Sequence, residues 1–286
     1  MSIASVYQLG ARLLPHVPPS LGYLLCDQLS YLGPLTPAWP QILFNLRQVL
    51  PRASAKEHRR IGRQIVAGLL TNYFDLLRAP MTSPAELARK TSVQGIPNLR
   101  IALARGKGVI VAMPHMGNLS LVAEPVTTLA DTTITVVVEQ LHDPAVHELI
   151  NSYRSRSNIQ TVEAGPQVAR QIMRALRAGG AVVLASDRTV GEATVEVEFF
   201  GRTAVVPAGP AWLAIRTGAP LLTAYTYRPT SARSVLVIDP PLAIERRGDL
   251  AADVRRVMQA VIRIFEAYIR RHPSQWLLTE SVWKPI

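Results

Sequence analysis

A histidine with a glycine and an asparagine close behind it follows a short apolar run. The run covers residues 108–113, and His115, Gly117 and Asn118 come soon after it. A histidine side chain titrates near neutral pH and can take a proton from a hydroxyl group. If a helix opens at Gly117 and Asn118, its first backbone N–H groups can stabilise a tetrahedral oxyanion. The pattern therefore indicates a general base beside an anion-binding site, with a purely structural histidine as the alternative.

Acidic and basic side chains follow two further apolar runs. Glu139 follows one of them, and Asp187 and Arg188 follow the other. Because the carboxyl ends of parallel strands meet at one edge of a sheet, both acids are expected to face the same crevice as His115. A carboxylate bonded to one ring nitrogen fixes the tautomer of a histidine and stabilises its charged form. Glu139 and Asp187 are therefore candidate partners of His115, with a solvated acid or a surface ion pair as the alternative for each.

The segments that must position these residues alternate between β-rich runs and helical stretches from residue 93 onward. The β-rich runs are 108–113, 133–138, 180–185, 195–200, 220–225 and 234–238, and the helical stretches lie near 117–130, 143–156, 166–178, 208–217 and 250–271. Strands that are buried on both faces give such apolar runs. The sequence therefore predicts an α/β fold with a mostly parallel central sheet flanked by helices. Glu196 and Glu198 alternate with apolar residues, which predicts a half-exposed strand.

The first 90 residues predict helices that are separated by prolines. These helices are expected at 2–14, 19–32, 38–49 and 55–78. The last is the clearest, because apolar residues recur every four positions from Ile61 to Leu77. We expect one domain over residues 1–286, with a helical part at 1–90 and an α/β catalytic core at 91–286.

The N-terminal segment is rich in leucine and aromatic residues but does not predict a membrane span. Charged residues and prolines interrupt residues 7–50 before the roughly 20 apolar residues that a span requires. The features of a cleavable signal peptide are also missing from this segment. Amphipathic helices of this composition can lie on a membrane surface. We expect a membrane-apposed segment, and packing of these helices against the domain is the alternative.

The balance of charge favours an anionic partner. Lysine and arginine number 31 against 20 acidic residues, which gives a net charge of +11. Arginine binds phosphate groups well, so nucleic acid, anionic lipid and phosphorylated substrates are the candidates. An aromatic content of 6% gives little support for base stacking, and no nucleic-acid partner is expected. Arginines spread over a solvated surface are the alternative.

Other chemistries have little support in the sequence. Cys26, the single cysteine, cannot form an intramolecular disulfide and is expected in the core. His142 and His147 do not share one helix face, and no matching third ligand is evident, so no metal site is expected. The sequence also lacks the nucleophile elbow, the P-loop and the dinucleotide-binding fingerprint.

Four motifs in order carry a resemblance to a known family. They are His115-Met-Gly-Asn118, Val197-Glu-Phe-Phe-Gly-Arg202, Ala208-Gly-Pro-Ala-Trp-Leu-Ala-Ile-Arg-Thr-Gly-Ala-Pro220 and His272-Pro-Ser-Gln-Trp276. Together they resemble the bacterial lysophospholipid-type acyltransferases of the lipid A late acyltransferase group, which includes the phosphatidylinositol mannoside acyltransferases. The likeness covers roughly residues 40 to 284.

The resemblance implies an enzyme that moves a fatty acyl chain to a hydroxyl group of a membrane glycolipid. The donor would be acyl-CoA or acyl-carrier protein as co-substrate, and no other cofactor is expected. The protein would lie peripherally on the anionic cytoplasmic face of the bacterial inner membrane. His115 would act as the base, with the N–H groups of Gly117 and Asn118 holding the oxyanion.

The resemblance also implies roles for residues outside the histidine motif. Arg154, Arg188 and Ser120 would contact the substrate, and Glu139 with Arg154 resembles a polar pair of the family. Phe199 and Phe200 would line an acyl-chain groove, with core packing as the alternative. Arginines in the middle of the chain could hold phosphates or form a solvated face; these are Arg154, Arg156, Arg170, Arg174 and Arg177.

One position departs from the family pattern. The family's histidine begins an H-x4-D/E motif, whereas Ser120 stands five residues after His115. The orienting carboxylate could come from another strand end, Ser120 could act through a water, or activity could be lost. We favour a carboxylate from another strand end, Glu139 or Asp187. A catalytically silent, lipid-binding member of the family is the alternative function.

Overall fold

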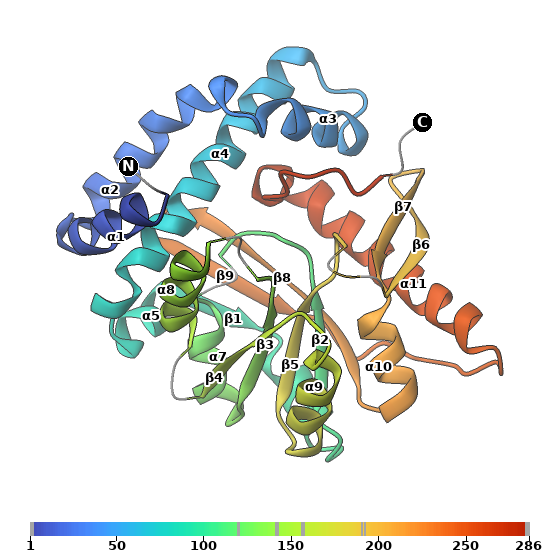
Figure 1. Ribbon diagram of the computed structural model, residues 1–286. Coiled ribbons are helices and arrows are strands. Elements are labelled where there is room, and N and C mark those ends of the chain that lie inside the picture. Colours follow the sequence, from blue (N-terminus) through green and yellow to red (C-terminus); the bar gives the residue numbers. More distant parts are fainter. Residues whose placement is uncertain are drawn as a thin grey trace.

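The central sheet confirms the predicted α/β architecture (Figure 1). The computed structural model describes residues 3–118, 121–140, 143–155, 158–189, 191 and 193–283. Within these residues, seven strands pair in the order β1-β9-β8-β2-β5-β3-β4. Their bounds are β1 Thr91–Gln94, β2 Val109–Met113, β3 Ile134–Val138, β4 Ile159–Glu163, β5 Ala181–Ala185, β8 Leu221–Thr230 and β9 Arg233–Ile238. In this part of the chain β8 and β9 pair antiparallel, and the other neighbours in the sheet pair parallel.

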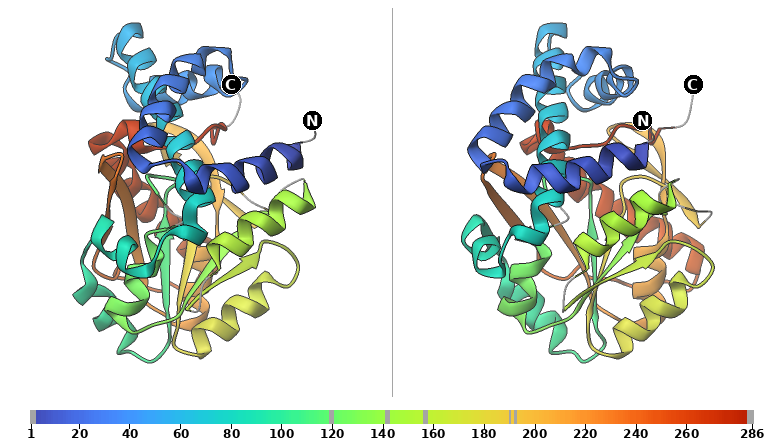
Figure 2. Two further views of the ribbon diagram at one scale, coloured as in Figure 1. Left: turned by 90° about the vertical axis from the view of Figure 1, so that its left-hand side faces the viewer. Right: turned by 60° about the vertical axis from the view of Figure 1, so that its left-hand side comes forward.

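Helices cover both faces of the sheet (Figures 1 and 2). Those of the α/β part are α5 Pro84–Lys90, α6 Ile96–Leu103, α7 Ala123–Ala130, α8 Pro144–Arg154, α9 Val168–Arg177, α10 Gly209–Thr217 and α11 Leu250–Arg271. Strand β2 is buried on both faces: Ile110 and Ala112 belong to the core under α9, α10 and α11, whereas Val109 and Val111 belong to the core under α6 and α7. Two separate apolar cores explain why the strand reads as a continuous apolar run.

A two-stranded ribbon stands apart from the main sheet. It consists of β6 Thr194–Phe199 and β7 Arg202–Pro207, paired antiparallel, and it packs on α11. Glu196 and Glu198 are exposed whereas Val197 and Phe199 are buried, which confirms the predicted half-exposed strand. The short strands β1 and β4 were not among the predicted runs, and both lie at the edges of the sheet.

The N-terminal helices gather around α4 at one end of the sheet (Figure 2). They are α1 Ile3–Leu13, α2 Pro19–Leu29, α3 Trp39–Val49 and α4 Ala55–Arg78, close to the predicted ranges. The hydroxyl group of Ser54 accepts a hydrogen bond from the backbone N–H of Glu57, which caps the start of α4. Cys26 is buried in α2, as predicted.

The N-terminal helices also carry large apolar side chains that remain exposed. Large apolar side chains of this region that remain exposed are Leu9, Leu13, Leu21, Leu24, Leu25, Leu29, Tyr31, Leu32 and Leu35. Leu24 is 56% exposed and Leu35 is 82% exposed. Leu21, Leu24, Leu25 and Leu29 recur at the spacing of one helix face, and an exposed apolar face is typical of an interaction site. Among the helices of the described residues, none combines the length and the apolar composition that crossing a bilayer requires.

The packing of α2 on α4 depends on a glycine. A Cβ atom added at Gly22 would lie 2.0 to 2.5 Å from three atoms of the Phe74 ring. Phe74 is itself buried, so it has little room to move. Overpacking of a buried contact typically costs about 1–3 kcal/mol.

We therefore expect Gly22→Ala to lower the thermal unfolding midpoint by roughly 2–6 °C, measured by circular dichroism. Gly10→Ala in α1 is the matched control, because a Cβ atom there would meet ordinary contacts at 3.4 and 3.7 Å. Alanine has the higher helix propensity, so this control should leave the midpoint unchanged or raise it. Equal midpoints for the two variants would contradict the tight contact at Gly22.

Candidate active site

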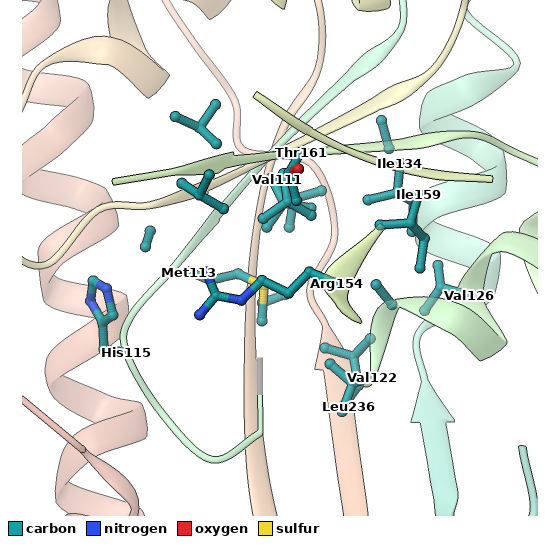
Figure 3. A pocket seen from close by; sticks show the side chains of 18 of the residues that line it. Val111, Met113, His115, Val122, Val126, Ile134, Arg154, Ile159, Thr161 and Leu236 are labelled. Carbon is teal, nitrogen blue, oxygen red and sulfur yellow. The ribbon is translucent and has the colours of Figure 1, made fainter. Parts of the chain in front are cut away.

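An apolar cavity of about 350 Å³ lies between one face of the sheet and the helices α6, α7 and α8 (Figure 3). Its polar end is formed by residues that follow strands, and they include His115, Glu139 and Arg188. The remaining lining is mostly aliphatic and includes Leu99, Val111, Val126, Ile134, Ile159 and Ala181. Ile134 begins β3 and Glu139 follows its end, so the cavity runs along the full strand, about 16 Å.

The register of the sheet brings His115 and Asp187 together. Met113 at the end of β2 pairs with Ala185 at the end of β5. His115 and Asp187 each lie two residues beyond that pair, on adjacent parallel strands. The Nδ1 atom of His115 is 2.6 Å from Oδ1 of Asp187. The carboxylate therefore comes from a neighbouring strand end, which is the explanation favoured from the sequence.

The carboxylate of Asp187 has further hydrogen-bond donors. The backbone N–H of His115 donates to Oδ2 at 2.9 Å, and the indole Nε1–H of Trp276 donates to the same oxygen at 2.8 Å. Asp187 has no solvent-exposed surface. Burial by itself raises the pKa of Asp187, but the charge and hydrogen bonds of His115 and the hydrogen bond of Trp276 lower it below its ordinary value. The acid is therefore held ionised, and Nε2 is left as the ring nitrogen of His115 that can receive a proton.

The backbone after β2 is fixed by bonds to distant segments. The carbonyl of His115 accepts from the N–H of Leu277 at 2.8 Å, and the N–H of Gly117 donates to the carbonyl of Gln275 at 2.9 Å. The carbonyl of Gly117 accepts from the side-chain amide of Asn72 at 2.5 Å. These bonds hold the turn between α4 and the C-terminal residues.

A close approach to β8 requires glycine at position 117. Gly117 has a φ of +56°, and a Cβ atom there would lie 2.6 Å from the carbonyl oxygen of Thr226. The hydroxyl group of Thr226 donates to the carbonyl of Met116 at 2.6 Å. The glycine of the motif is thus explained by backbone conformation and space.

The predicted helix start at Gly117 and Asn118 is wrong. Helix α7 begins at Ala123, because the turn instead forms a bridge between Met116 and Trp276. The N–H of Gly117 is occupied by Gln275, so it is not available to an oxyanion. The side chain of Asn118 is buried and lies against a smaller polar pocket, with its Nδ2 atom 3.5 Å from Oδ2 of Asp75.

The charged residues of the cavity pair differently from the prediction. Glu139 forms an ion pair with Arg188, not with Arg154. Arg188 also lies 3.4 Å from Glu280. Burial lowers the pKa of Arg188, but the two carboxylates raise it above its ordinary value. Glu139 therefore shares the cavity with His115, while its charge is matched by Arg188.

Arg154 ends α8 and lines the same cavity as His115. Its side chain extends across the cavity in the direction of His115 (Figure 3). Burial lowers the pKa of Arg154 below its ordinary value. A partly desolvated guanidinium favours an anionic group beside it.

Phe199 and Phe200 do not line the cavity, and the alternative of core packing holds for them. Phe199 is fully buried and stacks on Trp283 with ring centroids 5.7 Å apart. Phe200 contacts Phe199 and lies under the guanidinium of Arg270 at 4.8 Å. The ribbon that carries these residues packs on α11, away from the face of the sheet that forms the cavity.

The remaining predicted residues are either described away from the cavity or lie outside the described residues. Arg170, Arg174 and Arg177 are exposed on α9, which matches the alternative of a solvated face. Ser120, Arg156 and His142 lie outside the described residues. His147 contacts Glu163 at 2.8 Å. Within the described ranges, no cluster of three or more His, Cys, Asp or Glu side chains could hold a metal ion.

Sequence reasoning missed Trp276 as a partner of Asp187 and Asn72 as a partner of the turn. Trp276 belongs to one of the four family-like motifs, and that membership was the sequence feature that could have marked it as a site residue. Asn72 lies inside the apolar stripe of α4, and no local pattern marks it. The cavity was also missed, because the strand residues that line it read as ordinary core.

Comparison with known proteins adds to this description. Phosphatidylinositol mannoside acyltransferase of Mycobacterium tuberculosis is 29% identical over 214 residues, which cover 73% of this chain and 66% of that protein's length. The phosphatidylinositol mannoside acyltransferase of Mycolicibacterium smegmatis is 25% identical over 246 residues, 85% of this chain and 79% of that protein.

A solved structure, the 1-acyl-sn-glycerophosphate acyltransferase of Thermotoga maritima, is similar over 87% of this chain and 98% of that chain. Its sequence identity of 15% and TM-score of 0.35 are too low to bear on function. The family described as bacterial lipid A biosynthesis acyltransferase matches residues 2–285. Because this match covers nearly the whole chain, the protein belongs to the bacterial lipid A biosynthesis acyltransferase family.

Proposed function

We propose that the protein transfers a fatty acyl group from a thioester, acyl-CoA or acyl-carrier protein, to a hydroxyl group of a membrane glycolipid. The observation that carries the proposal is the hydrogen-bonded pair of His115 and Asp187 at the polar end of an apolar cavity. A base next to a site for an alkyl chain is the combination that acyl transfer to a hydroxyl group needs. The names of the mycobacterial relatives support a glycolipid acceptor.

In the proposed mechanism Nε2 of His115 takes the proton of the acceptor hydroxyl group. The oxygen attacks the thioester carbonyl, and the tetrahedral intermediate collapses by breaking the carbon–sulfur bond. The departing thiolate then receives the proton from the imidazolium, so an ester and a free thiol are formed. Asp187 stabilises the imidazolium throughout, because it stays ionised while it accepts the Nδ1–H bond.

We assign stabilisation of the oxyanion to the side chain of Arg154. The N–H groups of His115, Met116 and Gly117 already donate to Asp187, Pro114 and Gln275. Arg154 lines the same cavity and points toward His115, and a fixed cation in a water-poor site stabilises developing charge strongly. Arg188, with its charge matched by two acids, would hold the mouth of the cavity in shape.

The acyl chain would occupy the cavity, with the thioester at the His115 end. Its aliphatic lining along β2, β3 and β5 offers an alkyl chain contacts on the scale of a protein core. The end of the cavity away from His115 is formed by the first residues of the strands, including Ile134, Ile159 and Ala181, which are buried. The position of these residues would set the length of chain that fits.

The exposed apolar face of α1, α2 and the residues up to Leu35 would rest on the membrane that holds the acceptor. We propose that this membrane is the bacterial inner membrane and that the protein binds peripherally to its cytoplasmic face. A net charge of +11 favours anionic headgroups. Helix α4 connects this face to the site, because α2 packs on it while Asn72 and Tyr73 reach the turn and the cavity.

The activity is tested by following free thiol released from palmitoyl-CoA, or from palmitoyl-acyl-carrier protein, in the presence of bacterial glycolipids. We expect His115→Ala to lower turnover at least a hundredfold, because the base is lost. His16→Ala, at an exposed histidine of the N-terminal region, should keep wild-type turnover. Equal turnover in His115→Ala and wild type would refute the mechanism, and no turnover by either with any donor would favour the silent lipid-binding alternative.

The acyl site is tested by filling the buried end of the cavity, at the first residues of the strands. We expect Ala181→Leu to lower the turnover of a C16 donor relative to a C8 donor roughly tenfold, because each excluded methylene loses about 0.8 kcal/mol of burial. Val182→Ile is the matched control, since Val182 is the next residue of β5 and packs in the core of the opposite face. An unchanged C16 to C8 ratio in Ala181→Leu would place the acyl chain elsewhere.

Membrane binding is tested by replacing Leu21, Leu24 and Leu25 of α2 with serine. We expect binding to vesicles that contain anionic phospholipid, measured by co-sedimentation, to weaken at least tenfold, since these side chains would lose burial in the lipid. The control replaces Leu129 and Leu250, which are also exposed but lie outside the N-terminal helices. Equal weakening in both variants would argue against a specific membrane-facing surface.

A further inference from the structure

The C-terminal segment, residues 272–283, returns from α11 to the site. Its backbone bonds to both sides of the turn that follows β2: Leu277 donates to His115, and Gln275 accepts from Gly117. Met116 and Trp276 form a bridge between these two bonds. The segment thus lies against the turn that carries the base.

Trp276 is the residue of this segment that contacts the acid. Its side chain is 1% exposed, and its Nε1–H donates to Oδ2 of Asp187 at 2.8 Å. The other carboxylate oxygen, Oδ1, accepts from the ring of His115 at 2.6 Å. Oδ1 of Asp187 therefore bonds to the ring of His115 and Oδ2 to the indole of Trp276. A rotation of the carboxylate would break its bond to the imidazole.

The indole ring is itself fixed by aromatic neighbours. It meets Phe199 edge to face, with centroids 5.9 Å apart and an interplanar angle of 82°, and it meets Trp283 at 6.1 Å and 82°. Edge-to-face contacts of this kind define the direction of a ring. The buried ribbon residue Phe199 is thereby linked to the site through the ring of Trp276.

We propose that Trp276 is a positioning residue: its indole N–H holds the carboxylate of Asp187 in the orientation in which Oδ1 receives the Nδ1–H of His115. The inference rests on the proposed function, since it assigns the position of the proposed base. A buried carboxylate that loses one of its donors must find another or turn. A turned carboxylate would leave the imidazole without its fixed tautomer and orientation.

Trp283 offers a matched comparison in the same segment. It is 5% exposed, and its Nε1–H donates at 2.8 Å to the backbone carbonyl of Phe199. Replacing either tryptophan by phenylalanine removes one buried indole hydrogen bond and keeps an aromatic ring. Only Trp276→Phe loses a hydrogen bond to Asp187, whereas Trp283→Phe loses one to a backbone carbonyl.

The experiment measures kcat and KM for thiol release in Trp276→Phe, Trp283→Phe and wild type. We expect Trp276→Phe to lower kcat at least tenfold while KM for donor and acceptor stays within twofold. Trp283→Phe should keep kcat within twofold, because phenylalanine keeps an aromatic ring beside Trp276 and the bond that is lost is one to a backbone carbonyl. In an Asp187→Asn background, adding Trp276→Phe should change kcat less than twofold, because the bonded carboxylate is already gone. The inference would be overturned by a wild-type kcat in Trp276→Phe or by equal losses of kcat in the two tryptophan variants. It would also be overturned if Trp276→Phe lowered kcat tenfold in the Asp187→Asn background.

A second measurement does not depend on turnover. A histidine Nδ1–H that bonds to a buried carboxylate gives a slowly exchanging proton signal, which nitrogen-edited NMR can assign to His115 by its loss in His115→Ala. We expect this signal in wild type and in Trp283→Phe, and its loss or broadening in Trp276→Phe. If wild type shows no thioester turnover, the proposed function fails while this signal still decides the role of Trp276. An unchanged signal in Trp276→Phe would overturn the inference.

Discussion

The structure around the cavity depends on one buried charge. Asp187 has no exposed surface, and a carboxylate so placed is tolerated only when it is surrounded by donors. Its donors are the ring and the backbone of His115 and the indole of Trp276. Asp187 follows β5, His115 follows the adjacent strand β2, and Trp276 lies in the C-terminal segment, so three distant parts of the sequence must meet before the charge is satisfied. That requirement ties the position of His115 to the completion of the fold.

The same requirement leaves the turn after β2 with little freedom. The N–H and carbonyl groups from His115 to Gly117 are bonded to Asp187, which follows β5, to Pro114, and to residues of β8, α4 and the C-terminal segment. Under the proposed function, a base held in this way would need no rearrangement to meet a substrate, which is the advantage of a preorganised site. The N–H groups from His115 to Gly117 are all bonded, so under the proposed function the oxyanion would be stabilised by a side chain, that of Arg154.

Two apolar surfaces meet at the same helix. The cavity is lined by side chains that include Tyr73 of α4, and α2, which carries exposed leucines, also packs on α4. Under the proposed function, one surface would hold the acyl chain and the other would rest on the lipid layer that contains the acceptor. A donor chain could then be buried in protein while the hydroxyl group arrives from the membrane, and α4 would separate the two apolar phases.

The sequence by itself determined most of the helices and the central strands with their ends. The alternation of apolar runs and helical stretches, the amphipathic stripe of α4 and the positions of His115, Glu139 and Asp187 after their strands all follow from local periodicity. Only the tertiary structure decided which acid meets His115, because that depends on the β2-β5-β3 order and its register. It also decided that Glu139 pairs with Arg188 and that α7 starts after the turn. Those outcomes depend on bonds to residues far along the chain, such as the bridge between Met116 and Trp276, and no local sequence pattern encodes such bonds.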